Sequence, residues 1–142
     1  MAGACYDVPT PFPIFIMTDT TTSRALLLFA HGSSDPGWAA PFVQLQTTIR
    51  RRDPDQIVEL AYLERMQPSF DEAVDAMSAA GILHITVAPL FLAMGGHMRK
   101  DLPALIHNAQ KRTGIAFQLL PTIGEVDALI EAMADWVMDT RG

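Results

Sequence analysis

The chain has 142 residues, which at about 100 to 200 residues per domain predicts a single domain. Hydrophobic residues make up 49% of the chain and charged residues 18%, a composition that can bury a core and that excludes general disorder. The 10 basic and 16 acidic residues give a formal charge of −6, which argues against nucleic acid as a partner. No apolar run approaches the ~20 residues that span a bilayer, so we expect no membrane span.

Residues 1–23 are rich in Pro and then in Thr and show no hydrophobic period, so we expect an irregular N-terminal tail. Its first 17 residues contain no Lys or Arg and make a poor signal peptide, which favours a cytoplasmic protein. The apolar stretch 12–17 is a candidate for contact with a neighbouring chain. Cys5 is the only cysteine, so any metal must be held by His or carboxylate side chains.

Four short aliphatic runs alternate with four stretches of helical periodicity over residues 24–142. In chain order these predict a strand at 25–30, a helix around 38–49, a strand at 57–63, a helix around 70–77, a strand at 82–88, a helix around 102–109, a strand at 115–120 and a helix around 126–137. Ser69 and Glu72 have the spacing of a capping box, which predicts the start of the second helix. The last helix region carries five acidic residues, so we expect its outer face to be solvated.

This alternation predicts right-handed crossovers and one doubly wound, four-stranded parallel sheet, with the near-continuous apolar strands covered on both faces. The expected fold is an α/β domain at 24–142 with the flavodoxin-like strand order 2-1-3-4. In that order ligands bind above the carboxyl ends of the first and third strands.

Three residues with metal-binding chemistry follow predicted strands at that edge. His31 follows the first strand, Glu64 closes the second, and His97 lies in the loop after the third. Two imidazoles and a carboxylate suit a divalent transition metal with open coordination positions. His84 lies near the start of the third strand and His107 within the third helix, so we expect neither of them at the site.

Each of these residues also has a purely structural interpretation. A lone His after a strand is commonly a hydrogen-bonded structural residue, and Glu64 could simply pair with Arg65 or Arg99 at the surface. The glycines of the two loops, Gly32, Gly95 and Gly96, permit close backbone approach to a ligand, and helix N-termini favour anionic groups.

Several short motifs surround these residues: LLFAHGS at 27–33, DPGWA at 35–39, AYLE at 61–64 followed by Pro68, PLFL at 89–92, GGH at 95–97 and DLP at 101–103. Together they resemble the short form of the sirohydrochlorin cobaltochelatase family, the class II chelatases of cobalamin and sirohaem synthesis. The resemblance runs from Leu26 to about Glu125. One departure is Ser34, where the family commonly has Arg.

The resemblance implies a lyase that inserts a divalent metal into a tetrapyrrole of the sirohydrochlorin type. It implies that His31 and His97 handle the metal and catalyse the insertion, with Glu64 as their acidic partner. The macrocycle loses two N–H protons as the metal enters, and a neutral imidazole can hold a metal and then accept a proton. The metal is a substrate, with Co²⁺ expected first and Fe²⁺ or Ni²⁺ as alternatives, and no organic cofactor is expected.

Long members of this class contain two α/β units facing one another, whereas this chain has the length of one. We therefore expect a homodimer, with the tetrapyrrole in the cleft between units. Residues expected to bind it are Gly32, Ser33, Leu92, Met94, Gly95, Gly96, Arg99 and Lys100. The apolar part of this set is open, because Phe91 and Leu92 could instead belong to the core.

Two other functions are compatible with a His directly after the first strand. Histidine phosphatases carry Arg-His-Gly there, but residue 30 is Ala, so a phosphate pocket would lack its main cation. A non-catalytic metal or tetrapyrrole carrier could use the same histidines without turnover. Ser34, in place of the family's Arg, is the feature that most favours the carrier.

Overall fold

The structure, a computed structural model, describes residues 23–140, so the predicted tail and its apolar stretch 12–17 lie outside the described residues. The elements are β1 (Arg24–Ala30), η2 (Pro36–Ala39), α1 (Ala40–Arg52), β2 (Ile57–Tyr62), α2 (Phe70–Ala79), β3 (His84–Pro89), α3 (Gly96–Thr113), β4 (Ala116–Leu119), η3 (Ile123–Glu125) and α4 (Asp127–Asp139). The predicted alternation of strands and helices is confirmed, with strand ends displaced by at most two residues. No helix within 23–140 is long and apolar enough to cross a membrane.

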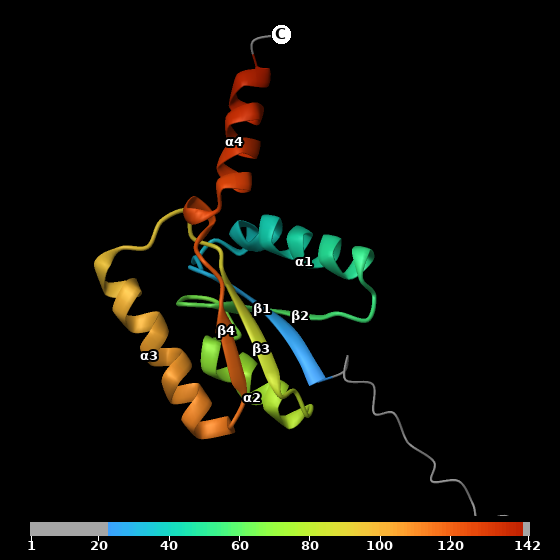
Figure 1. The fold of residues 1–142 in the computed structure, drawn as a ribbon, viewed down its shortest axis with the longest axis vertical. Coiled ribbons are helices and arrows are strands. Elements are labelled where there is room, and N and C mark those ends of the chain that lie inside the picture. The colour runs from blue at the N-terminus through green and yellow to red at the C-terminus, as the bar shows by residue number, and fades with distance from the viewer. Residues whose placement is uncertain (1–22, 141–142) are drawn as a thin grey trace, which may run out of the picture.

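The four strands form one parallel sheet with the order β2-β1-β3-β4, the flavodoxin-like order expected for a short α/β unit of this kind. In its register Ala30 lies beside Tyr62, and Phe29 lies between Ala61 and Pro89. The carboxyl ends of β1, β2 and β3 therefore meet at one edge of the sheet, which lies at the upper left of the sheet in Figure 1.

Helices α2 and α3 cover one face of the sheet and enclose the larger core. Phe29 is fully buried there, with its ring edge-on to Phe70 at a centroid distance of 5.5 Å. On the surface above, Arg112 of α3 pairs with Asp71 and Asp75 of α2 at 3.2 and 3.0 Å. The buried members of this core are Ala25, Leu27, Phe29, Ala61, Phe70, Ala73, Val74, Met77, Ile82, Ile85, Val87, Leu102, Ala109 and Ile115.

Helix α1 covers the other face over β1 and β2. Trp38 and Phe42, with their ring centroids 4.7 Å apart, pack against a second core on this face. Its buried members are Leu28, Ala30, Val58, Leu60 and Tyr62. Gln46 and Arg50 both donate hydrogen bonds to the carbonyl oxygen of Val58, at 2.8 and 2.6 Å. These bonds fix α1 along β2, away from β3 and β4.

Helix α4 departs from the expectation of a cover helix with only its outer face solvated. None of its residues is buried, and it projects from the body beyond the carboxyl edge of the sheet, with η3 as its main neighbour (Figure 1). Its apolar side is exposed as well. Hydrophobic periodicity identifies the helix and its apolar side, but it carries no information about which surface covers that side.

Candidate active site at the carboxyl edge

The pairing of β1 with β2 continues beyond both strands and places His31 beside Glu64. The N–H of Leu63 donates to the carbonyl oxygen of Ala30 at 2.9 Å, and the N–H of Glu64 donates to that of His31 at 3.1 Å. The two side chains follow this alignment, with Nδ1 of His31 3.9 Å from Oε1 of Glu64. The predicted meeting of these two residues is therefore present in the structure.

Gly32 makes this close approach possible. Its φ angle is +93°, a conformation that residues with a Cβ rarely adopt, and a Cβ at this position would overlap the carbonyl oxygen of Glu64. A glycine is therefore required for the chain to turn away from β1 while His31 stays beside Glu64.

The Glu64 carboxylate is shared between two cationic or potentially cationic side chains. Its Oε1 lies 3.8 Å from Nε of Arg65 as well as 3.9 Å from His31. Both separations are too long for hydrogen bonds, and the side chains of His31 and Glu64 are 57% and 53% exposed. The pair is thus accessible to a ligand, and the carboxylate lies within ion-pairing distance of the imidazole.

The aromatic ring of Phe91 contacts the imidazole of His31. It lies edge-on to the imidazole, with the centroids 6.1 Å apart, and edge-on to Phe29 at 5.8 Å. Phe91 is partly buried and packs against the core, whereas Leu92 is 59% exposed. The sequence leaves open whether these two residues belong to the core, and the structure turns only Phe91 toward it.

A hollow of about 120 Å³ lies on the same edge, between the loop after β3 and η3. Its lining includes three residues of the predicted substrate set, Leu92, Met94 and Arg99. Backbone hydrogen bonds close it, since the N–H of Gly124 donates to the carbonyl oxygen of Leu92 at 2.9 Å. A Cβ on Gly124 would overlap that oxygen, so this residue is a second required glycine.

Thr122 and Glu125 also line this hollow, and hydrogen bonds between them fix η3. Neither residue is among the predicted site residues. The N–H and the hydroxyl of Thr122, which is buried, each donate to Oε2 of Glu125 at 3.0 Å. These hydrogen bonds, with a smaller contribution from the charge of Arg99, lower the pKa of Glu125 below its usual 4.5. The Thr-x-x-Glu spacing of a capping box is the sequence signal that could have identified both residues.

His97 is the second residue of α3, and it is exposed. Apart from adjacent residues and the backbone of the same helix, no atom lies within 4 Å of a Cβ built on Gly95 or Gly96, so the chain leaves room for a ligand at both. Arg99 donates from Nε to the carbonyl oxygen of Met94 at 3.3 Å, and Lys100 beside it is exposed.

Within residues 23–140, no three His, Cys, Asp or Glu side chains gather closely enough to hold a metal ion. The structure therefore joins His31 to Glu64 but forms no three-ligand centre within one chain. That His97 completes the site stays a prediction. The two other histidines are placed as expected, with His84 at the first position of β3 and His107 in the middle of α3.

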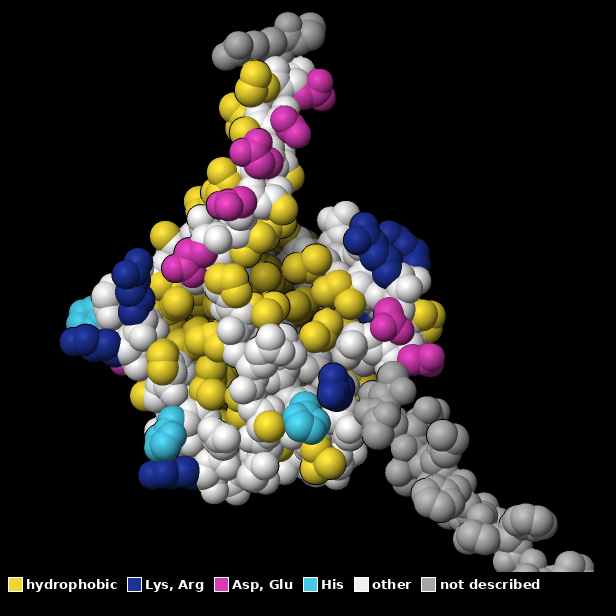
Figure 2. All heavy atoms as spheres, viewed as in Figure 1, with side chains coloured by type: hydrophobic (Ala, Val, Ile, Leu, Met, Phe, Trp, Pro, Cys, Tyr) yellow, Lys and Arg dark blue, Asp and Glu magenta, His cyan; other side chains and the backbone are white. Residues whose placement is uncertain are grey.

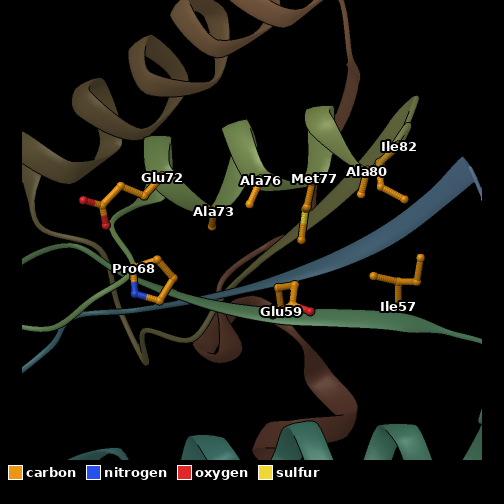
Figure 3. Close-up of a pocket in the computed structure, with 9 residues that line it drawn as sticks. All are labelled: Ile57, Glu59, Pro68, Glu72, Ala73, Ala76, Met77, Ala80 and Ile82. Atoms are coloured by element: carbon orange, nitrogen blue, oxygen red, sulfur yellow. The ribbon is translucent and has the colours of Figure 1, made fainter.

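A separate apolar hollow of about 190 Å³ lies between α2 and the edge strand β2 (Figure 3). Ala73, Ala76 and Met77 line its helix side. Its two carboxylates have partners elsewhere, since Glu72 accepts from the N–H of Ser69 at 2.9 Å and Glu59 pairs with Arg50 at 3.5 Å. None of the predicted site residues lines it, so it is not part of the candidate site.

The comparison with known protein families agrees with this arrangement. The CbiX family model matches residues 25–140, which include both strands of the His31 and Glu64 pair. The chain belongs to the CbiX family. The match also covers α4, so the projecting helix is part of the family's region and not an appendage.

Proteins similar to this CbiX chain include a sirohydrochlorin cobaltochelatase and a CbiX protein of known structure. The sirohydrochlorin cobaltochelatase of Methanosarcina barkeri is 31% identical over 61% of this chain and spans 66% of its own length. A CbiX protein from Marinobacter aquaeolei VT8, assigned to cobalamin (vitamin B12) biosynthesis, is 35% identical with a TM-score of 0.74, covering 82% of this chain and 96% of its own.

A third comparison concerns chain length. The sirohydrochlorin chelatase SirB from Bacillus subtilis, whose structure contains cobalt, matches 82% of this chain with a TM-score of 0.69 and 23% identity. At that identity the likeness establishes the fold alone. This chain spans only 50% of the SirB chain, as expected for a short form.

Proposed function

We propose that this CbiX chain inserts a divalent metal into sirohydrochlorin, with Co²⁺ as the main metal. The observation that carries the proposal is the His31 and Glu64 pair at the carboxyl edge of a sheet that belongs to the CbiX family. In this fold that edge is where ligands bind.

The reaction exchanges one metal ion for two protons of the macrocycle. The metal forms bonds to the pyrrole nitrogens, two N–H bonds break, and two protons leave. A neutral His31 imidazole can bind the incoming metal through its nitrogen lone pair, and it becomes free to accept a proton once the metal has moved to the macrocycle. Glu64, 3.9 Å away, stabilises the resulting imidazolium and can pass the proton to solvent. His97 is assigned the second metal contact and the second proton.

The loop after β3 and the start of α3 are proposed to bind the macrocycle. Leu92 and Met94 present apolar side chains beside a hollow that a flat ring can cover. Arg99 and Lys100 supply the positive charge that the carboxylates of sirohydrochlorin require. Backbone N–H groups at Gly32, Ser33, Gly95 and Gly96 are the remaining proposed contacts, because the second pair is exposed and the first pair is only partly buried.

The imidazole and carboxylate ligands of the site do not by themselves select Co²⁺ over other divalent metals. Imidazole and carboxylate accept Fe²⁺, Co²⁺ and Ni²⁺ alike, with affinity rising in that order. Support for cobalt comes from the name of the Methanosarcina barkeri relative, a sirohydrochlorin cobaltochelatase. Fe²⁺ and Ni²⁺ are alternative substrates of the same site, and the mechanism uses no organic cofactor.

We further propose that the active form is a homodimer, because one chain corresponds in length to half of SirB. Two copies would then provide the two units between which a large macrocycle can lie. Cytoplasmic localisation stays a prediction from the sequence.

A carrier that binds metal or tetrapyrrole without turnover is the second candidate, favoured by Ser34 in place of the family's Arg. Ser34 is exposed next to the site, and its side chain is uncharged. This position therefore supplies no positive charge to the site. The histidine phosphatase alternative loses support, since Ala30 is buried and nonpolar where that class has Arg.

Turnover separates these functions. Purified protein at one-hundredth of the sirohydrochlorin concentration is mixed with excess Co²⁺ under anaerobic conditions, and the absorbance of the metallated product is followed. A chelatase converts many equivalents faster than the protein-free control. A carrier gives at most one equivalent per chain, and hydrolysis of a chromogenic phosphate ester without metallation would favour the phosphatase.

A further inference from the structure

The apolar hollow between α2 and β2 has the chemistry of a core and not of a ligand site. Ala73, Met77 and Ile82 in its lining are buried members of the larger core. Its carboxylates, Glu59 and Glu72, already have partners. Its volume of about 190 Å³ is below the roughly 300–1,000 Å³ of pockets that hold small molecules. A few apolar side chains are therefore the occupant that fits.

The hollow is elongated and follows the edge strand β2. Ile57 and Ile82 line one end of it and Pro68 lines the other (Figure 3). The N–H of Tyr62 donates to the carbonyl oxygen of Pro68 at 2.9 Å, so that end lies beside the last residue of β2. The five steps along the strand from Ile57 to Tyr62 measure about 17 Å, which is also the length of an extended segment of six residues.

The outer side of β2 is open to an added strand along this hollow. The carbonyl of Val58 is bonded to side chains of α1, and the N–H of Tyr62 is bonded to the loop before α2. Leu60, at the alternate position between them, directs its N–H and carbonyl to the same outer side. Among the described elements no strand pairs with that side, apart from a single bridge between Tyr62 and Ser69. An open edge of this kind accepts an extended segment.

The sequence contains a segment of matching length and chemistry before β1. Residues 12–17 are Phe-Pro-Ile-Phe-Ile-Met, six apolar residues in a row. Prolines occupy the alternate positions 9, 11 and 13, so in an extended segment their missing N–H groups all fall on one side. Within sheets, Pro is confined mainly to edge strands, where that side faces solvent. The segment is therefore suited to the outermost position beside β2.

The connection to β1 brings this segment close to the hollow. The carbonyl of Ser23 accepts from the N–H of Leu83 at 2.8 Å, and Ala25 is the register partner of Ile57. Since neighbouring strands are about 4.8 Å apart, β1 begins beside the Ile57 end of the hollow. The six steps from Met17 to Ser23 reach up to about 20 Å. Such a short tether gives the segment a high effective concentration relative to any other chain.

A second apolar surface is less accessible to the segment. Figure 2 shows hydrophobic side chains gathered over the end of the body from which α4 projects. That end is the carboxyl edge of the sheet, separated from Ser23 by the seven residues of β1. The tether therefore favours the hollow, whose near end lies at the edge where β1 begins.

We propose that residues 12–17 bind in the hollow of their own chain, along the outer side of β2. The tether sets the direction, with the last residue of the segment at the Ile57 end and the first at the Pro68 end. The segment then covers the apolar surface of α2 that is exposed at Ala76 and Ala80. It also closes the open edge of the sheet against other chains.

A nitroxide at residue 10 tests where the segment lies. The full-length chain carries Cys5→Ser and Thr10→Cys, so that the label attaches to one cysteine, and amide NMR intensities are compared with the nitroxide oxidised and reduced. We expect the signals of Ser69 and Glu72, at the Pro68 end, to lose most of their intensity. Gln118 of β4, at the opposite edge of the sheet, should keep its intensity.

A mixture separates binding within a chain from binding between chains. Isotope-labelled chains without nitroxide are mixed with unlabelled chains that carry it, so only contacts between copies reduce the signals. We expect no loss in this mixture. Loss at Glu72 in the mixture would show that another copy supplies the segment, and full intensity in both samples would show that the segment does not bind in the hollow. Either result would overturn the proposal.

A substitution in the hollow provides the second test. Ala76→Glu places a carboxylate in the apolar lining, and Ala79→Glu is the matched control, because Ala79 is exposed on the same helix outside the hollow. Circular dichroism checks the fold, and Ala76→Gln replaces the variant if it unfolds.

We expect Ala76→Glu to abolish the loss of the Glu72 signal and to accelerate chymotrypsin cleavage after Phe15 about tenfold relative to the control, because cleavage follows the population of released segment. Equal signal loss and equal cleavage rates in the Ala76 variant and the control would contradict the proposal. None of these measurements involves metallation, so a failure of the chelatase assignment stays distinct.

Discussion

Nδ1 of His31 lies 3.9 Å from Oε1 of Glu64, although the two residues are 33 positions apart in the chain. The relationship is produced by the parallel pairing of β1 and β2, whose hydrogen bonds continue to Glu64 N–H and the carbonyl oxygen of His31. The side chains are thus placed by backbone bonds of the sheet, and they remain exposed to a ligand. In the proposed reaction, His31 is the proton acceptor and Glu64 is its carboxylate partner.

The first prediction concerns the turn that keeps this pair together. Gly32→Ala should lower the free energy of unfolding by about 1–3 kcal/mol, because Ala rarely adopts its positive φ angle and its Cβ would overlap Glu64. Urea unfolding measures this loss. Gly37→Ala is the matched control, since a Cβ there meets only Asp35 at 3.4 Å. Equal stability of the Gly32 variant and the control would show that the turn is not constrained.

A second prediction follows from the lowered pKa of Glu125. A carboxyl group whose pKa is lower in the folded state stabilises the fold above its usual pKa of 4.5, and this contribution is lost as the pH falls through the folded value. Melting temperatures should therefore drop below about pH 4.5, and Glu125→Gln should remove that part of the pH dependence. Glu131→Gln, on the exposed acidic side of α4, serves as the control. If the melting temperature of the Glu125→Gln variant fell with pH as steeply as that of the natural chain, the assigned hydrogen bonds would be contradicted.

The capping box of α2 gives a third prediction. The hydroxyl of Ser69 accepts from Glu72 N–H at 3.2 Å, so Ser69→Ala should cost about 1 kcal/mol of stability. Ser78→Ala, near the other end of α2, is the comparison. Metallation at a temperature well below melting should be unaffected by either change, because neither residue is in the proposed site. A large loss of rate in the Ser69 variant would extend the site to α2.

Sequence patterns predicted most of the fold because secondary structure and the pairing of neighbouring strands depend mainly on local sequence and on simple connection rules. Aliphatic runs such as 25–30 mark buried parallel strands, and right-handed crossovers limit the strand order to few choices. The position of α4 was not predictable in this way. Trp136 and Val137 show that the helix has an apolar side, but only three-dimensional packing determines what contacts that side.

The candidate site was predictable to a similar extent. Strand ends and topology brought His31 to Glu64, which the structure confirms. Phe91 and its neighbour Leu92 could not be separated in the sequence, since both are apolar and only the sheet geometry turns one inward. Gly124 was missed because its requirement arises from the approach of Leu92, a contact between residues 32 positions apart.

A fourth prediction concerns substrate binding by α3. Arg99→Gln should raise the KM for sirohydrochlorin about tenfold with a smaller change in kcat, because it removes a charge-assisted contact to a substrate carboxylate and leaves the metal-handling residues in place. Lys111→Gln, at the far end of α3, is the control for the lost charge. Initial rates over a range of sirohydrochlorin concentrations measure both constants. An unchanged KM in the Arg99 variant would remove this residue from the proposed substrate site.

The central claim is that the histidines at the carboxyl edge insert the metal, and His84 and His107 provide internal controls because they lie elsewhere in the fold. The direct measurement is the initial rate of Co²⁺ insertion into sirohydrochlorin by four single His→Ala variants, with the protein-free rate subtracted. We predict that the variants at His31 and His97 lose about 100-fold or more, as expected for removal of a proton acceptor, whereas the two control variants stay within about twofold of the natural chain. Full activity of the His31 variant, or no rate above the protein-free control with Co²⁺, Fe²⁺ or Ni²⁺ for the natural chain, would contradict the claim.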